Sequence, residues 1–111
     1  MKDMLSYKKY FGSIHYNQED RIFYGKIEFI RALISYEGRD GDTLEAAFEE
    51  AVEDYLATCS EQGTTPEKPF KGSFNVRIAP ELHERVAIAA SQHGMSLNRY
   101  VAEALSQAVN Q

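Results

Sequence analysis

Cysteine, tryptophan and long apolar runs are what this chain has least of. Its 111 residues include one cysteine, Cys59, and no tryptophan. A single cysteine excludes an intrachain disulfide framework and suits a reducing compartment. No apolar run approaches the ~20 residues of a membrane-spanning helix, and residues 1–5 lack an apolar signal core. We therefore expect a cytoplasmic protein that does not enter a membrane.

The residues that catalysis would need are also sparse. His15, His83 and His93 have no paired cysteines and no second histidine three or four residues away, so they lack metal-site spacing. Cys59 has no neighbouring histidine and falls on an apolar stripe, which suits a buried thiol better than a nucleophile. There is no glycine-rich phosphate loop. Four carboxylates could bind a divalent ion in principle, but we expect them on turns and strand edges: Asp20, Glu28, Asp40 and Asp42. We expect no enzyme, no cofactor and no metal.

The charge that is present is unevenly divided along the chain. The net charge is −5. Residues 1–67 hold 7 Lys or Arg and 14 Asp or Glu, a net of −7, whereas residues 68–111 hold 5 and 3, a net of +2. Two prolines with glycine and threonine in residues 62–69 are typical of a short, stiff linker. These features predict a domain at residues 1–63, a linker at 64–71 and a second domain at 72–111.

The second domain begins with an alternating segment. Phe74, Val76 and Ile78 alternate with Ser73, Asn75 and Arg77, and a period of two predicts a half-buried strand. Pro80 ends the strand and suits the first turn of a helix, Gly94 suits a helix end, and Ser96 suits the N-cap of a second helix. The two helical stripes are Leu82, Val86 and Ala89 or Ala90, then Leu97, Val101, Ala104, Leu105 and Ala108. The order is one strand and two helices.

One strand with two short helices cannot satisfy its backbone groups alone. Two copies can pair their strands antiparallel and share one core, and in this respect the segment resembles the ribbon-helix-helix DNA-binding domains. A polar strand face alone is more often merely solvated, but the whole order of elements favours the resemblance. It implies that Ser73, Asn75 and Arg77 read bases in the major groove. The first turn at Ser96, Leu97 and Asn98, with Lys71, would bind phosphates.

The first domain is predicted to be α+β, with a three-stranded antiparallel sheet and one helix. Residues 7–16 and 22–27 are rich in aromatic and β-favouring residues and flank a polar turn, which indicates a hairpin. A third strand is expected at residues 33–36. A helix capped by Asp40 or Asp42, with Asp42 and Glu45 at capping-box spacing, should run to about Ser60. Its apolar stripe is Leu44, Phe48, Ala51, Val52, Tyr55, Leu56 and Cys59.

Nearly the full chain resembles the HicB-type antitoxins of toxin–antitoxin pairs. The following blocks carry the resemblance: Tyr24-Gly25-Lys26-Ile27, Ile34-Ser35-Tyr36-Glu37-Gly38, residues 48–56 (Phe48 to Leu56), Pro69-Phe70-Lys71-Gly72, residues 74–78, Pro80-Glu81-Leu82-His83 and Ser96-Leu97-Asn98. The chain departs from the family at Phe29-Ile30-Arg31-Ala32, where many relatives have Gly-Ile-x-Asp. Any toxin contact through that aspartate is absent here.

The resemblance implies two functions. The first domain, a partial RNase H-like fold without activity, would mask a small mRNA-cleaving toxin of the HicA type. The second would repress its own operon by binding operator double-stranded DNA as a homodimer, or as a tetramer formed by two dimers. An RNA-cleaving toxin must hold a polyanion and is expected to be basic, so an acidic domain suits it. The candidate toxin contacts are Glu49, Glu50, Glu53 and Asp54, although each singly is more often part of a solvated helix face.

An alternative is a ribbon-helix-helix repressor whose first domain senses a small ligand. The aromatic hairpin could line a pocket, although core packing is the commoner use of such rings. The rings in question are Tyr7, Tyr10, Phe11, Tyr16, Phe23 and Tyr24. A neighbouring gene for a small basic protein would favour the antitoxin, and an isolated gene would favour the sensor.

Overall fold

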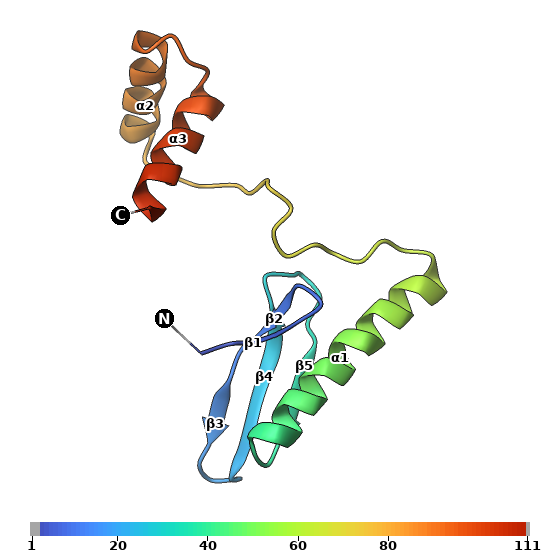
Figure 1. Cartoon of the computed structure of the whole chain (residues 1–111). Coiled ribbons are helices and arrows are strands. Elements are labelled where there is room, and N and C mark those ends of the chain that lie inside the picture. Colours follow the sequence, from blue (N-terminus) through green and yellow to red (C-terminus); the bar gives the residue numbers. More distant parts are fainter. Residues whose placement is uncertain (1–2, 111) are drawn as a thin grey trace. The chain divides into compact units, whose positions relative to one another are not determined.

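A computed structural model describes residues 3–110 of the chain. The chain divides into two units, the first ending at Ser73 and the second beginning at Phe74. Residues 64–71, expected as a linker, belong to the first unit. Figure 1 shows the elements of both units, coloured from blue at the N-terminus to red at the C-terminus.

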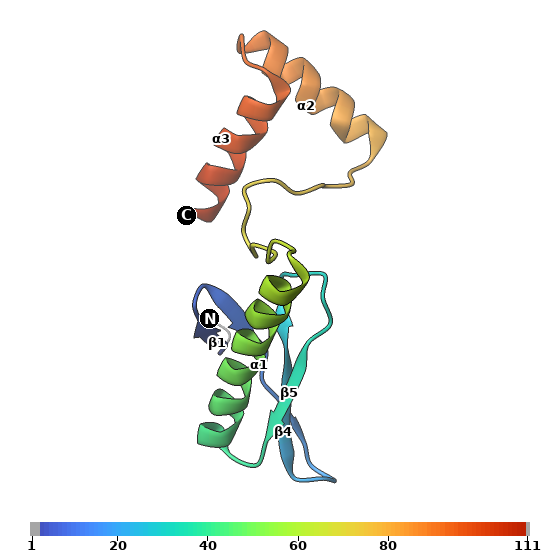
Figure 2. The same ribbon diagram turned by 90° about the vertical axis from the view of Figure 1, so that its right-hand side faces the viewer.

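The first unit is a layer of antiparallel strands with one helix against it (Figure 2). Within residues 3–110 the sheet has five strands: β1 (Leu5–Tyr7), β2 (Tyr10–Gly12), β3 (His15–Asn17), β4 (Ile22–Glu28) and β5 (Ser35–Gly38). β4 is central, because β2 and β3 both pair with it along one edge and β5 pairs along the other, while β1 lies outside β2. The α+β class is confirmed, but the expected count of three strands is wrong.

The miscount arises at residues 7–16, which do not form one strand. Lys8 and Lys9 form a two-residue turn between β1 and β2, with φ of 49° and 69°. Positive φ at both positions is the geometry of a type I′ hairpin turn, which normally selects Asn-Gly. Further on, the Ser13 hydroxyl accepts a hydrogen bond from the Lys26 amide at 3.0 Å. This side-chain bond replaces a ladder bond, so the strand breaks between β2 and β3.

The remaining boundaries of the first unit differ only slightly from expectation. The third expected strand begins two residues later, as β5. The helix is α1 (Gly41–Gln62), and its N-cap is Asp40. The Asp40 carboxylate accepts a 2.8 Å bond from the Thr43 amide, and the Thr43 hydroxyl accepts a 3.1 Å bond from the Asp40 amide. The capping box is therefore Asp40 with Thr43, and the expected Asp42–Glu45 pairing is wrong.

The core lies between α1 and one face of the sheet. Leu44, Phe48, Val52 and Cys59 of the expected stripe are buried. The sheet contributes Tyr10, Ile27 and Tyr36, together with glycines that let the layers approach closely. The Tyr36 hydroxyl donates a 2.8 Å hydrogen bond to the Ser13 carbonyl, and burial raises the pKa of Tyr36 to about 12.

The second unit contains the two expected helices, α2 (Pro80–Gln92) and α3 (Leu97–Val109). Pro80 is the first residue of α2. Gly94 follows the helix end with φ of 67°, and the Gly94 and Met95 amides donate to the Ser91 and Ala90 carbonyls. This is a Schellman motif, which requires a residue that tolerates positive φ. The Ser96 hydroxyl accepts a 3.1 Å bond from the Arg99 amide, so the predicted N-cap is confirmed.

Gly25 provides a direct test of the close packing in the first unit. A Cβ at this position would overlap the Ser13 carbonyl oxygen, which is backbone and cannot rotate away. We expect Gly25→Ala to lower the free energy of unfolding by about 1–3 kcal/mol, the usual range for overpacking. Urea unfolding followed by circular dichroism measures it.

The matched control is Gly41→Ala, because a Cβ there meets nothing within 4 Å and Gly41 opens a helix. This control should be neutral or slightly stabilising. Equal stability of the two variants would contradict the packing described here.

Candidate functional site

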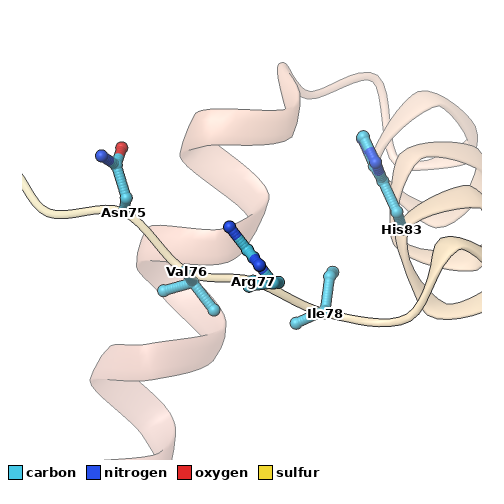
Figure 3. A pocket seen from close by; sticks show the side chains of 5 residues that line it. All are labelled: Asn75, Val76, Arg77, Ile78 and His83. Carbon is cyan, nitrogen blue, oxygen red and sulfur yellow. The ribbon is translucent and has the colours of Figure 1, made fainter.

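The candidate DNA-reading residues lie in a segment without regular structure. Residues 73–79 form no hydrogen-bonded ladder within the described chain and are exposed throughout. In Figure 3 the side chains of Asn75 and Arg77 project to one side of the backbone, whereas Val76 projects to the other. The predicted alternation of polar and apolar side chains is therefore visible at these three residues. The predicted strand pairing with a second copy stays a prediction.

The apolar side chains of this unit are largely uncovered. Ala90 is the one buried residue among residues 74–110, at 1% exposure. Phe74 is 72% exposed and Val76 is 64% exposed, and α3 contributes no buried residue at all. The other exposed large apolar residues of the unit are Ile78, Leu82, Ile88, Leu97, Val101, Leu105 and Val109. A single copy of this unit thus has apolar helix faces but almost no core. Monomeric domains normally bury such faces.

The candidate phosphate contacts lie in two places. Leu97 and Asn98 are the first two residues of α3, where backbone amides have no acceptor within the helix. The Ser96 hydroxyl accepts its hydrogen bond from the Arg99 amide, so it does not occupy the Leu97 and Asn98 amides. Lys71 is exposed and precedes Ser73 by two residues. Lys71 belongs to the first unit, whereas the first turn of α3 belongs to the second.

The second unit, which begins at Phe74, has no net charge. Residues 74–111 carry three arginines and three glutamates: Arg77, Arg85, Arg99, Glu81, Glu84 and Glu103. The excess of +2 in residues 68–111 therefore resides in Lys68 and Lys71, which lie before the boundary.

The candidate toxin contacts lie along α1. Glu50, Glu53 and Asp54 are exposed, and Glu49 is half-buried. Glu53 is paired with the Lys8 ammonium at 2.5 Å, so its charge is already partly neutralised. Glu49, Glu50 and Asp54 make no ion pair within residues 3–110 and remain available to a cationic partner.

The rings that a ligand pocket would need lie in separate groups. Tyr10 packs edge-on against Tyr55 of α1, with ring centroids 6.0 Å apart. Tyr16 stacks on Phe23 at 4.7 Å. Phe11 instead contacts Phe70, at 5.5 Å. The expected aromatic hairpin therefore does not gather its rings around one pocket.

Sequence reasoning missed an anchor at Glu67. Its carboxylate accepts bonds from the Arg31 and Ala32 amides at 2.8 Å and 3.1 Å. Its carbonyl accepts a 2.8 Å bond from the Tyr10 hydroxyl, and its amide donates a 3.0 Å bond to the Tyr55 hydroxyl. The hydrogen bond from the Arg31 amide is the main reason that the pKa of Glu67 lies below its usual value.

A second anchor lies three residues further on. The ring of Phe70 packs against Phe11 of β2 and against Phe29, with centroids 5.5 Å and 5.0 Å apart. Phe29 has a φ of 65° in the loop between β4 and β5. The sequence offers one signal for this contact, which is that the apolar Phe70 lies between Pro69 and Lys71 in an otherwise polar stretch. Residues 67–70 are thus fixed to the first unit at both ends.

The comparisons with known proteins agree with the resemblance over the second half of the chain. The model of the HicB family matches residues 55–105, from the last part of α1 to most of α3. This match supports a HicB-type protein. Comparison with curated proteins and with solved structures gives no match. Among residues 3–110, no helix has the length and apolar character needed to cross a membrane.

The Glu67 anchor should make stability depend on pH. Its pKa is lowered in the folded state, so its contribution is complete above the ordinary glutamate pKa of about 4.3 and disappears as pH falls through the lowered value. Glu67→Gln should therefore unfold at lower urea than the unchanged chain at pH 7, and the difference should shrink below about pH 4.

The matched control is Glu61→Gln, an exposed carboxylate of α1 that makes no side-chain hydrogen bond within the described residues. It should lose no stability at either pH, and can gain slightly at pH 7 because it removes a negative charge from the last turn of α1. A Glu67→Gln variant as stable as the unchanged chain at pH 7 would show that the anchor contributes nothing.

Proposed function

We propose that this chain is a HicB-type antitoxin with two binding functions and no catalytic one. The second unit dimerises and represses the chain's own operon by binding operator DNA, and the first unit masks a small, basic, mRNA-cleaving toxin in the cytoplasm. The observation that carries the proposal is the exposed, alternating and unpaired segment at residues 73–78, beside two uncovered helical stripes. The HicB family match over residues 55–105 supports it.

Dimerisation is the first step of the proposal. Antiparallel pairing of two copies of residues 73–78 would satisfy backbone groups that have no partner in one chain. It would also place two copies of Phe74, Val76 and Ile78 on one face of a ribbon, over the stripes of α2 and α3. This is the ribbon-helix-helix arrangement, which closes by two-fold symmetry and can associate further into a tetramer.

DNA reading follows from the other face of the same ribbon. A two-stranded ribbon fits the major groove, where arginine suits the two acceptors of guanine and asparagine suits adenine. Asn75 and Arg77 lie on the side of the backbone opposite to Val76, as this role requires (Figure 3). Ser73 belongs to the same face, while Lys71 and the first turn of α3 (Ser96, Leu97 and Asn98) would bind phosphates.

Toxin masking is proposed for the acidic first unit. Its acidic residues outnumber its basic ones by two to one over residues 1–67, which favours a cationic partner. Glu49, Glu50 and Asp54 are the contacts proposed on α1, with Glu53 shared with Lys8. The partial RNase H-like fold is consistent with the antiparallel sheet and its single covering helix.

Val76→Lys tests the dimer. In the proposed core, each valine contributes about 1.5–3 kcal/mol by burial, and the change is present in both copies. The dimer dissociation constant should therefore rise by roughly 100-fold or more. Light scattering across a dilution series measures it, with Asn75→Lys as the matched control on the opposite side of the segment. If Val76→Lys and Asn75→Lys dimerise equally, Val76 is not in the interface.

Arg77→Ala tests DNA reading. Loss of one bidentate base contact typically costs ~1–3 kcal/mol, and a palindromic site loses two. Binding to the chain's own promoter should weaken by roughly twice that energy, with much less loss on random DNA. Arg85→Ala removes the same charge from α2 and should have little effect on the preference for the promoter.

The same variant separates the two functions. Arg77→Ala should still rescue cells that express the neighbouring toxin, because the proposed toxin contacts lie in the first unit. Unchanged promoter binding would rule out the reading role of Arg77. Lost rescue by a soluble, dimeric variant would rule out the division of labour between the units.

A further inference from the structure

The first unit is acidic overall, but it carries a local group of basic side chains. Residues 3–73 contain five lysines. Three of them, Lys8, Lys9 and Lys68, line one hollow together with Tyr10, Pro69 and Phe70. We refer to Lys8, Lys9 and Lys68 as the lysine cluster. A fourth lysine, Lys71, follows Lys68 along the chain, so only Lys26 lies elsewhere.

Two anchors hold this cluster in place. Lys68 follows Glu67, whose main chain is bonded to the Tyr10 and Tyr55 hydroxyls and whose carboxylate is bonded to the Arg31 and Ala32 amides. It precedes Phe70, whose ring packs on Phe11 and Phe29. Residues 68 and 69 are thus fixed beside the turn between β1 and β2. A fixed cationic surface loses less conformational entropy on binding than lysines on a mobile linker would.

The backbone of the turn gives no reason for lysine at either position. Both have positive φ, 49° at Lys8 and 69° at Lys9, where asparagine and glycine are the unstrained choices. Strained backbone of this kind persists where the side chain has another use. Lys8 is paired with Glu53, but Lys9 and Lys68 make no ion pair within residues 3–110. Two lysines without an ion-pair partner therefore line the same hollow.

We infer that the lysine cluster is a phosphate-binding site that contacts the DNA backbone beside the sequence read by residues 73–77. This inference rests on the proposed function, and it assigns part of the DNA contact to the unit otherwise proposed to bind toxin. Ser73 is the fifth residue after Lys68, so the chain limits the distance between their Cα atoms to about 18 Å. About five phosphates of one DNA strand fall within that length. Contacts to them add affinity without adding sequence preference.

The test uses the full chain with Lys9→Gln and Lys68→Gln combined. Fluorescence anisotropy with a random duplex, between about 50 and 200 mM salt, gives the slope of log affinity against log salt. Each lost phosphate contact should reduce the magnitude of that slope by about 0.9, hence by up to about 3.6 for two lysines in each copy of a dimer. The matched control, Arg21→Gln with Lys26→Gln, removes the same charge from the same unit and should leave the slope unchanged.

A second variant separates folding from binding. Lys9→Gly relieves the strained turn and should raise Tm by about 4 °C or more, while weakening binding to the random duplex. A purely structural role for Lys9 would instead give unchanged or tighter binding in the more stable variant, and this would overturn the inference.

The outcomes distinguish the inference from the proposed function. If the unchanged chain does not bind duplex DNA, both fail. If it binds, and the double glutamine variant has the same slope, only the lysine cluster is refuted. If that variant keeps its slope but loses capture of the toxin, the cluster belongs to a protein interface and the inference is equally overturned.

Discussion

Backbone hydrogen bonding at residues 73–78 is the constraint on which the rest of the molecule depends. These amides and carbonyls have no ladder partner within the described chain, and the apolar side chains between them are exposed. Neither α2 nor α3 offers a strand with which they could pair. In the proposed dimer, the same segment of a second copy of the chain pairs with it and supplies these partners. The proposed DNA-reading face exists only after that pairing, so repression would depend directly on assembly.

Much of the second unit could be predicted from local sequence chemistry. Pro80, Gly94 and Ser96 set the helix ends because their backbone and capping preferences act within a few residues. The first unit was less predictable. The break between β2 and β3 depends on a hydrogen bond between Ser13 and Lys26, thirteen residues apart. Its turn at Lys8 and Lys9 lacks the usual Asn-Gly signal. Periodicity cannot indicate either feature, because both arise from contacts with neighbouring strands.

The candidate site was also predictable only where it depends on local sequence. The residues of the reading segment follow from alternation, and Figure 3 shows Asn75 and Arg77 on one side of it. The anchoring of Glu67 and Phe70 could not be predicted, because their partners at Tyr10, Phe11 and Arg31 lie 36 or more residues earlier. Composition alone indicated a linker there. The anchors give residues 67–70 a fixed path on the first unit.

Amide hydrogen exchange of residues 73–78 in the full chain tests the central claim most directly. In an antiparallel ribbon, alternate amides along each strand donate to the partner strand and the others face away. The account predicts slow exchange at every second amide of this segment, with protection that declines as the protein is diluted below its dimer dissociation constant. Rapid exchange at all of these amides at the highest protein concentration would contradict it.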